Sequence, residues 1–176
     1  MTNRKKTLYF AYGMNTNLDS MARRCPAAKS LGKITLEGYK FVFRGVGDVI
    51  YTGKLQDKIE GAAWLITEEC EKSLDRLEGF PSFYGKVYEP ILFNGKPESI
   101  MIYQMTKQNA RGIYDPSESY WNMLFEGYAS HEMNHDQMYN GLPTHSKYKS
   151  VEHIKARRRY KNKQNALWQN INLNKY

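Results

Sequence analysis

The stretch Leu8–Asn17, LYFAYGMNTN, runs from apolar and aromatic residues with high β-sheet preference into a glycine and then two asparagines. This pattern predicts a buried strand that ends in a tight turn at Gly13. Because glycine has no Cβ, the turn can adopt backbone angles closed to other residues and lets a ligand approach the main chain. The N–H groups that follow, and a helix expected over Leu18–Arg24, would favour a carboxylate or carbonyl oxygen there. The turn is therefore a candidate anion-binding site.

A second stretch, residues 67–84, places a glutamate at the end of a helix. Thr67 is a favourable N-cap residue, and Gly79 is positioned to stop a helix that runs to about Leu77. Glu78 then lies at the helix C-terminus, where the helix dipole disfavours its negative charge. The following segment FPSFY, Phe80–Tyr84, can shield this carboxylate from water, and burial raises the pKa of a carboxyl group. From these residues alone, a solvated carboxylate at a helix end is the plainer interpretation of Glu78.

Taken together, the two stretches resemble the gamma-glutamylcyclotransferase family, including its AIG2-like members. The family pattern has a strand ending in YGSN, here Tyr12–Asn15, and later a glutamate in an LDxxEG context, here Leu74–Gly79. The RCP sequence at Arg24–Pro26 is also similar to bacterial members, and the resemblance covers about residues 8–125. It implies an α+β fold built on a small mixed β-barrel with flanking helices, with the site in a cavity at one end.

The reaction that this resemblance implies is an intramolecular aminolysis. The α-amine of a γ-glutamyl amide attacks its own γ-carbonyl, which yields 5-oxoproline and a free amine, and the reaction needs no metal or cofactor. Glu78 would act as the general acid/base. The implied substrate-binding residues are those of the turn, Tyr12, Gly13, Met14 and Asn15. Further candidates are Tyr84 and Tyr103, which lie on expected strands, and Tyr120, which lies in a PSxxY run similar to the family; for these three tyrosines a position in the core is the alternative. Met14 stands where the family usually has serine; the change is mild if the position acts through its N–H, but affects substrate fit if it acts through a hydroxyl.

The remaining pattern predicts six or seven strands and few helices, compatible with this α+β class. The expected strands after the first are Gly32–Leu36, Tyr39–Phe43, Val49–Leu55, Gly61–Ile66, Val87–Phe93 and Ser99–Thr106. We expect the strands at 49–55 and 61–66 to pair as a hairpin. Asn94-Gly95 is a strong hairpin signal, and Pro90 favours an edge strand. The sequence DPSE at 115–118 predicts the start of a further helix.

Charge divides the chain into an expected domain at residues 1–140 and a basic extension at residues 141–176. The extension holds nine of the 26 Lys and Arg residues but only one acid, Glu152, which accounts for the whole formal net charge of +8. Its basic run within residues 147–163, expected as a polar helix, leaves contact with nucleic acid as an alternative function. A non-catalytic, AIG2-like binding protein is a further alternative, which Met14 and the extension favour. The sequence does not decide the oligomeric state.

Cellular location and metal binding are also addressed by the sequence. The two cysteines have no metal-ligand spacing, and the apolar run near the start is too short for a signal peptide or membrane span, which predicts a cytoplasmic protein without membrane contact.

Residues 131–135, HEMNH, match the zinc motif HExxH. The metzincin extension is absent, because Met138 and Gly141 occupy the positions of its glycine and third histidine. We therefore expect solvated surface histidines and no metal site.

Overall fold

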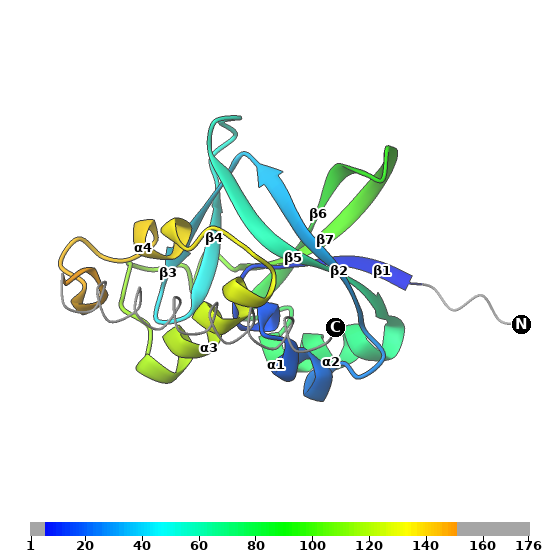
Figure 1. Ribbon diagram of the computed structural model, residues 1–176, viewed down its shortest axis with the longest axis horizontal. Helices are drawn as coiled ribbons and strands as arrows, with labels where there is room; N and C mark the ends of the chain where they lie inside the picture. The colour runs from blue at the N-terminus through cyan, green and yellow to red at the C-terminus, as the bar shows by residue number, and fades with distance from the viewer. Residues whose placement is uncertain (1–5, 151–176) are drawn as a thin grey trace, which may run out of the picture.

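The computed structural model describes residues 6–150, and its centre is a five-stranded mixed sheet with helices packed against it (Figure 1). The sheet has the order β2-β5-β1-β7-β6, in which β1 pairs antiparallel with β5 and parallel with β7. Its strands are β1 (Lys6–Ala11), β2 (Lys29–Glu37), β5 (Lys58–Thr67), β6 (Tyr84–Phe93) and β7 (Lys96–Met105). The expected α+β class is confirmed, although this sheet is open: no pairing joins β2 to β6 within the described residues.

The expected hairpin between the strands at 49–55 and 61–66 is wrong. Strand β4 (Gly47–Tyr51) folds back on β3 (Tyr39–Phe43) to form a separate two-stranded sheet, whereas β5 pairs with β2 and β1. The reason is local: Gly45, with φ of +81°, turns the chain tightly between β3 and β4. The Asn94-Gly95 hairpin is confirmed, with φ of 51° and 75°, and β6, which carries Pro90, is an edge strand as expected.

Helices cover both faces of the large sheet, as the alternation along β1 requires. Tyr9 and Ala11 point into an apolar cluster with residues of α1 and α2, whereas Phe10 and Tyr12 point into a second cluster with α3 and β3. The helices are α1 (Leu18–Arg24), α2 (Glu68–Glu78), α3 (Glu118–Ser130) and α4 (Asp136–Asn140), with short 3₁₀ turns η1 (Met14–Thr16) and η2 (Lys147–Lys149). The helix predicted over 18–24 is therefore confirmed.

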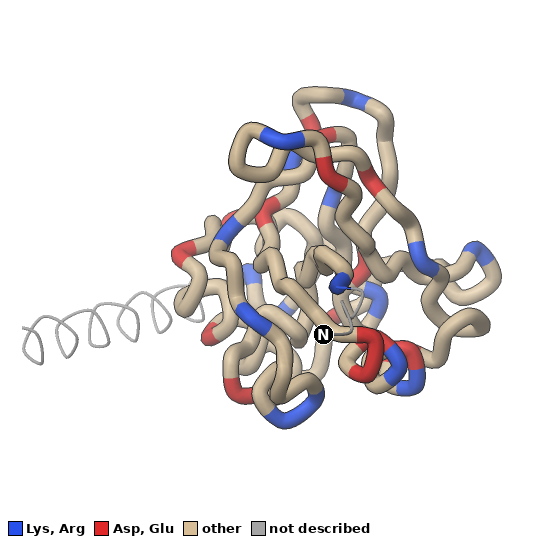
Figure 2. Tube along the Cα trace, turned by 90° about the vertical axis from the view of Figure 1, so that its right-hand side faces the viewer, with Lys and Arg blue, Asp and Glu red and all other residues tan. Residues whose placement is uncertain are grey.

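The first part of the expected extension packs against the rest of the chain. Gly141 accepts a hydrogen bond from the N–H of Phe43 (2.9 Å), and the ring of Tyr148 stacks on Trp121 at 4.5 Å. Most of the basic run predicted within residues 147–163 lies outside the described residues. Figure 2 shows lysine and arginine interspersed with acidic residues along the described trace. None of the helices between residues 6 and 150 has the length and apolar character needed to span a bilayer.

Candidate active site

Helix α2 carries Glu78 back to the end of β1 at which the chain turns. Strand β5 runs antiparallel to β1, with Lys6 opposite Thr67, so α2 begins beside the start of β1 and returns across the sheet. Its 11 residues span about 16 Å, close to the length of the six-residue strand β1. Thr67 caps the helix by accepting the N–H of Cys70, and Gly79 ends it with φ of +63°, as predicted. Because the helix and the strand have similar lengths, Glu78 lies beside the turn that follows β1.

The carboxylate of Glu78 is held by the turn. Its Oε1 accepts a hydrogen bond from Asn15 Nδ2 (3.0 Å), and the same amide nitrogen donates to the Tyr9 hydroxyl (2.9 Å). Burial raises the pKa of Glu78 to about 6, although the Asn15 hydrogen bond and the positive charge of Arg24 act in the opposite direction. Glu78 therefore changes its protonation state close to neutral pH.

Arg24, the last residue of α1, fixes the other end of the Asn15 amide. Its Nη1 donates to Asn15 Oδ1 (2.5 Å), and its Nη2 contacts the Met14 Sδ (3.1 Å). Because the amide oxygen faces Arg24, the amide nitrogen must face Glu78 and Tyr9. Met14 thus directs its side chain to a guanidinium.

Tyr120 of α3 packs between two glycine turns. Its hydroxyl oxygen accepts the N–H of Gly47 (2.9 Å). A Cβ on Gly13 would lie 2.9 Å from this oxygen, and a Cβ on Gly47 would lie 3.0 Å from it. The φ of Gly13 is −103°, so the glycine is required for space rather than for a left-handed backbone. Burial raises the pKa of Tyr120 to about 12.

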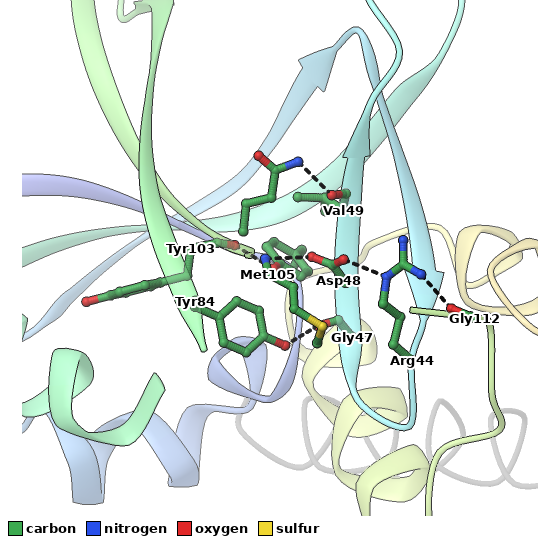
Figure 3. Close-up of polar contacts among 10 residues, drawn as sticks. Arg44, Gly47, Asp48, Val49, Tyr84, Tyr103, Met105 and Gly112 are labelled. Carbon is green, nitrogen blue, oxygen red and sulfur yellow. Dashed lines mark hydrogen bonds and ion pairs between the residues drawn. The ribbon is translucent and has the colours of Figure 1, made fainter. Parts of the chain in front are cut away.

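Three other predicted tyrosines form walls and direct their hydroxyls to the protein. Tyr12 donates to the Tyr103 carbonyl (2.5 Å) and Tyr84 to the Gly47 carbonyl (2.7 Å), whereas Tyr103 donates to Asp75 Oδ1 (2.6 Å). Figure 3 shows the Tyr84 ring reaching from β6 to Gly47 at the start of β4. Each ring is thereby held in one orientation.

These side chains surround one cavity of about 260 Å³, which brings together every site residue predicted from the sequence. Its lining comprises Tyr9, Tyr12, Gly13, Met14, Asn15, Arg24, Val46, Gly47, Leu77, Glu78, Phe83, Tyr84, Tyr103 and Tyr120. Tyr9, Arg24 and Gly47 are the polar contributions that sequence reasoning missed. Of the aromatic segment after Glu78, Phe83 and Tyr84 reach the cavity, whereas the Phe80 ring faces the Lys86 ammonium at 4.7 Å.

Two N–H groups of the turn are engaged within the protein. Thr16 donates its N–H to the Gly13 carbonyl and Asn17 donates to the Met14 carbonyl, both at 3.0 Å. The cavity also offers polar side chains: the carboxylate of Glu78, the guanidinium of Arg24 and the hydroxyls of Tyr9 and Tyr120.

The HExxH segment is not helical and is not solvated as expected. Helix α3 ends at Ser130, His131 follows it as the C-cap, and Glu132 has φ of +54°, so the two histidines do not share a helix face. His131 is buried against the Trp64 ring, which lowers its pKa, so the expectation of two surface histidines is wrong for this residue. Within residues 6–150, no three His, Cys, Asp or Glu residues gather as metal ligands.

Burial of the Glu78 charge has a measurable cost in stability. Because the folded-state pKa, about 6, exceeds the usual 4.5, the native state binds more protons than the unfolded state between these values. Stability contributed by Glu78 is therefore lost as the pH rises from about 4.5 to 6. We expect Glu78→Gln to raise the free energy of unfolding by about 1–2 kcal/mol at pH 8 and to leave it unchanged at pH 4. Urea unfolding at the two pH values measures this; equal effects at both would contradict it.

Comparison with known proteins identifies relatives of this fold. The sequence model for "Gamma-glutamyl cyclotransferase, AIG2-like" matches residues 9–123, which is more than half of the chain. A solved gamma-glutamyl cyclotransferase has a TM-score of 0.66 at 19% identity, covering 86% of this chain and 98% of its own. An uncharacterized Homo sapiens protein has a TM-score of 0.65 at 20% identity, and the match covers 86% of this chain and 97% of the human one. YkqA from Bacillus subtilis has a TM-score of 0.61 at 17% identity, and the match covers 90% of this chain and 55% of YkqA. No curated protein matches the chain.

Proposed function

The chain belongs to the gamma-glutamyl cyclotransferase, AIG2-like family, and on this premise we propose that it cyclises γ-glutamyl amides. The products are 5-oxoproline and the free amine. The observation that carries the proposal is the environment of Glu78. Its pKa is raised to about 6, and its side chain lines an aromatic-walled cavity of about 260 Å³. Such a carboxyl group can both accept and return a proton near neutral pH.

In the proposed reaction Glu78 carries protons between the two nitrogen atoms. It first accepts a proton from the α-ammonium of the substrate, and the freed amine attacks the γ-carbonyl carbon to form the ring C–N bond. Glu78 returns this proton to the nitrogen of the departing amine, and the γ-amide C–N bond breaks. The ring nitrogen gives its second proton to Glu78, which passes it to the released amine, so that 5-oxoproline keeps one N–H and the amine leaves as an ammonium. Asn15 holds the carboxylate in place throughout by its 3.0 Å hydrogen bond.

The oxyanion that develops on the γ-carbonyl needs donors, and the cavity offers two hydroxyls. Tyr9 and Tyr120 accept hydrogen bonds from Asn15 and from Gly47, respectively. Within residues 6–150 neither hydroxyl donates to a protein acceptor, so their protons are available to a ligand. Fixed donors of this kind stabilise an oxyanion without reorganisation.

The direct test is incubation of the full chain with γ-glutamyl amino acids and γ-glutamyl amines. We expect 5-oxoproline and the free amine to appear in equal amounts, measured by mass spectrometry. Heat-inactivated protein is the control for spontaneous cyclisation. Binding of these compounds without product would instead support the binding-protein alternative, and neither binding nor product would reject the family activity for this chain.

The pH dependence of the reaction follows from the raised pKa of Glu78. The base must be unprotonated in the free protein, so we expect kcat/KM to fall about tenfold per pH unit below pH 6. If the base were an ordinary exposed glutamate, the fall in kcat/KM would begin near pH 4.5. Initial rates between pH 4.5 and 8 locate the midpoint. A midpoint at or below 4.5 would rule out a buried Glu78 as the base.

A further inference from the structure

Arg24 lies in the wall of the cavity without a carboxylate partner. Its hydrogen-bonding contacts are with neutral groups, the Asn15 Oδ1 (2.5 Å) and the Met14 Sδ (3.1 Å). Among the described residues, none of the salt bridges involves this guanidinium. A guanidinium has five N–H donors and stays protonated in proteins, so a charged group with unused donors faces the cavity.

The Asn15 amide sets the spacing between this positive charge and Glu78. Arg24 binds its oxygen, and Glu78 accepts from its nitrogen at 3.0 Å, so opposite charges lie at the two ends of one amide group. Both side chains line the same cavity. An α-amino-acid head has a matching arrangement, because its ammonium and carboxylate are attached to one carbon atom.

We propose that Arg24 binds the α-carboxylate of the γ-glutamyl head while Glu78 faces the α-ammonium. The inference rests on the proposed function, because the glutamyl head is the ligand assigned there. Arginine suits this task, since its planar fork can donate two parallel hydrogen bonds to a carboxylate. The substrate class is thereby narrowed to γ-glutamyl compounds in which both the α-amine and the α-carboxylate are free.

A purely structural role for Arg24, orienting the Asn15 amide, makes a different prediction. Loss of that orientation would weaken the binding of every ligand of the cavity alike. Loss of a carboxylate anchor would weaken the binding of only those ligands that carry the carboxylate. The two roles are therefore separated by a pair of ligands that differ in this group alone.

The experiment uses L-5-oxoproline and 2-pyrrolidone, which is the same lactam ring without the carboxylate. Binding to the full chain is measured by calorimetry or by chemical-shift titration, which requires no turnover. We expect the wild type to favour 5-oxoproline by about 10- to 100-fold, as charge-assisted hydrogen bonds imply. Arg24→Gln is expected to lose that preference. Arg23→Gln is the matched control, because Arg23 is adjacent, equally charged and exposed.

Three results would overturn the inference: equal binding of both ligands by the wild type, binding of neither, or a preference that survives in Arg24→Gln. If circular dichroism shows that Arg24→Gln does not fold, Arg24→Lys replaces it and is expected to lose most of the preference, because an ammonium lacks the fork. Absence of 5-oxoproline formation by the wild type would reject the proposed function. An Arg24-dependent preference in the same protein would still establish the carboxylate anchor, so the two failures are distinguishable.

Discussion

Replacing Glu78 with glutamine is expected to lower the rate of 5-oxoproline release by about 10²- to 10⁴-fold, the usual contribution of a general acid–base group. The physical reason is specific to the proton transfer. Glutamine has nearly the same shape, and its side-chain oxygen can still accept the Asn15 Nδ2 hydrogen bond that Glu78 Oε1 accepts at 3.0 Å. Folding and ligand binding should therefore persist while the proton carrier is lost. Single-turnover kinetics with a γ-glutamyl amide measure the effect.

The matched control for this variant is Glu68→Gln, which removes a charge from the same helix. Glu68 lies at the start of α2, is largely exposed and pairs with Lys72, far from the cavity lining. We expect its rate to remain within about twofold of the wild type, because exposed ion pairs contribute little. A Glu78→Gln rate equal to that of the control would remove Glu78 from the reaction and leave the raised pKa without a catalytic role.

Local signals in the sequence were sufficient to predict the element that carries Glu78. The cap at Thr67 and the left-handed stop at Gly79 are determined by residues within a few positions, so the bounds of α2 followed from them. The strand leading to Gly13 was equally local, because its apolar run and its glycine are adjacent. The glutamate and the turn could be associated only through the family resemblance, since 63 residues separate Asn15 from Glu78.

The missed contributions all depend on contacts between distant segments. Arg24 was treated as a helix-end residue, and nothing nearby in sequence indicates that its side chain turns toward Asn15. Gly47 lies at the start of β4, and its importance comes from Tyr120 on α3, 73 positions away. The burial of His131 likewise depends on Trp64 of β5. Periodicity and capping report on neighbours along the chain, so they cannot specify which segments meet.

The second large effect is expected at Asp48, which holds the β3–β4 hairpin beside the cavity (Figure 3). Its Oδ2 accepts from Arg44 Nε (2.8 Å) and its Oδ1 accepts the N–H of Met105 (2.9 Å), with the two charged side chains only 2% and 11% exposed. Asp48→Ala leaves Arg44 without a counter-charge and the Met105 N–H without this acceptor. We expect the free energy of unfolding to fall by about 3–5 kcal/mol, measured by urea denaturation.

The control for Asp48 is Glu37→Ala, which breaks an ion pair of similar length at an exposed position. Glu37 and Lys58 approach to 2.7 Å with about half of each side chain exposed, so the expected loss is about 0–1 kcal/mol. The double variant Arg44→Met/Asp48→Ala should recover part of the stability, because it removes the unpaired buried charge. A loss below about 1 kcal/mol for Asp48→Ala would contradict the role of this pair. Since Gly47 adjoins Asp48 and contacts both Tyr84 and Tyr120, a destabilised hairpin should also weaken ligand binding in the cavity.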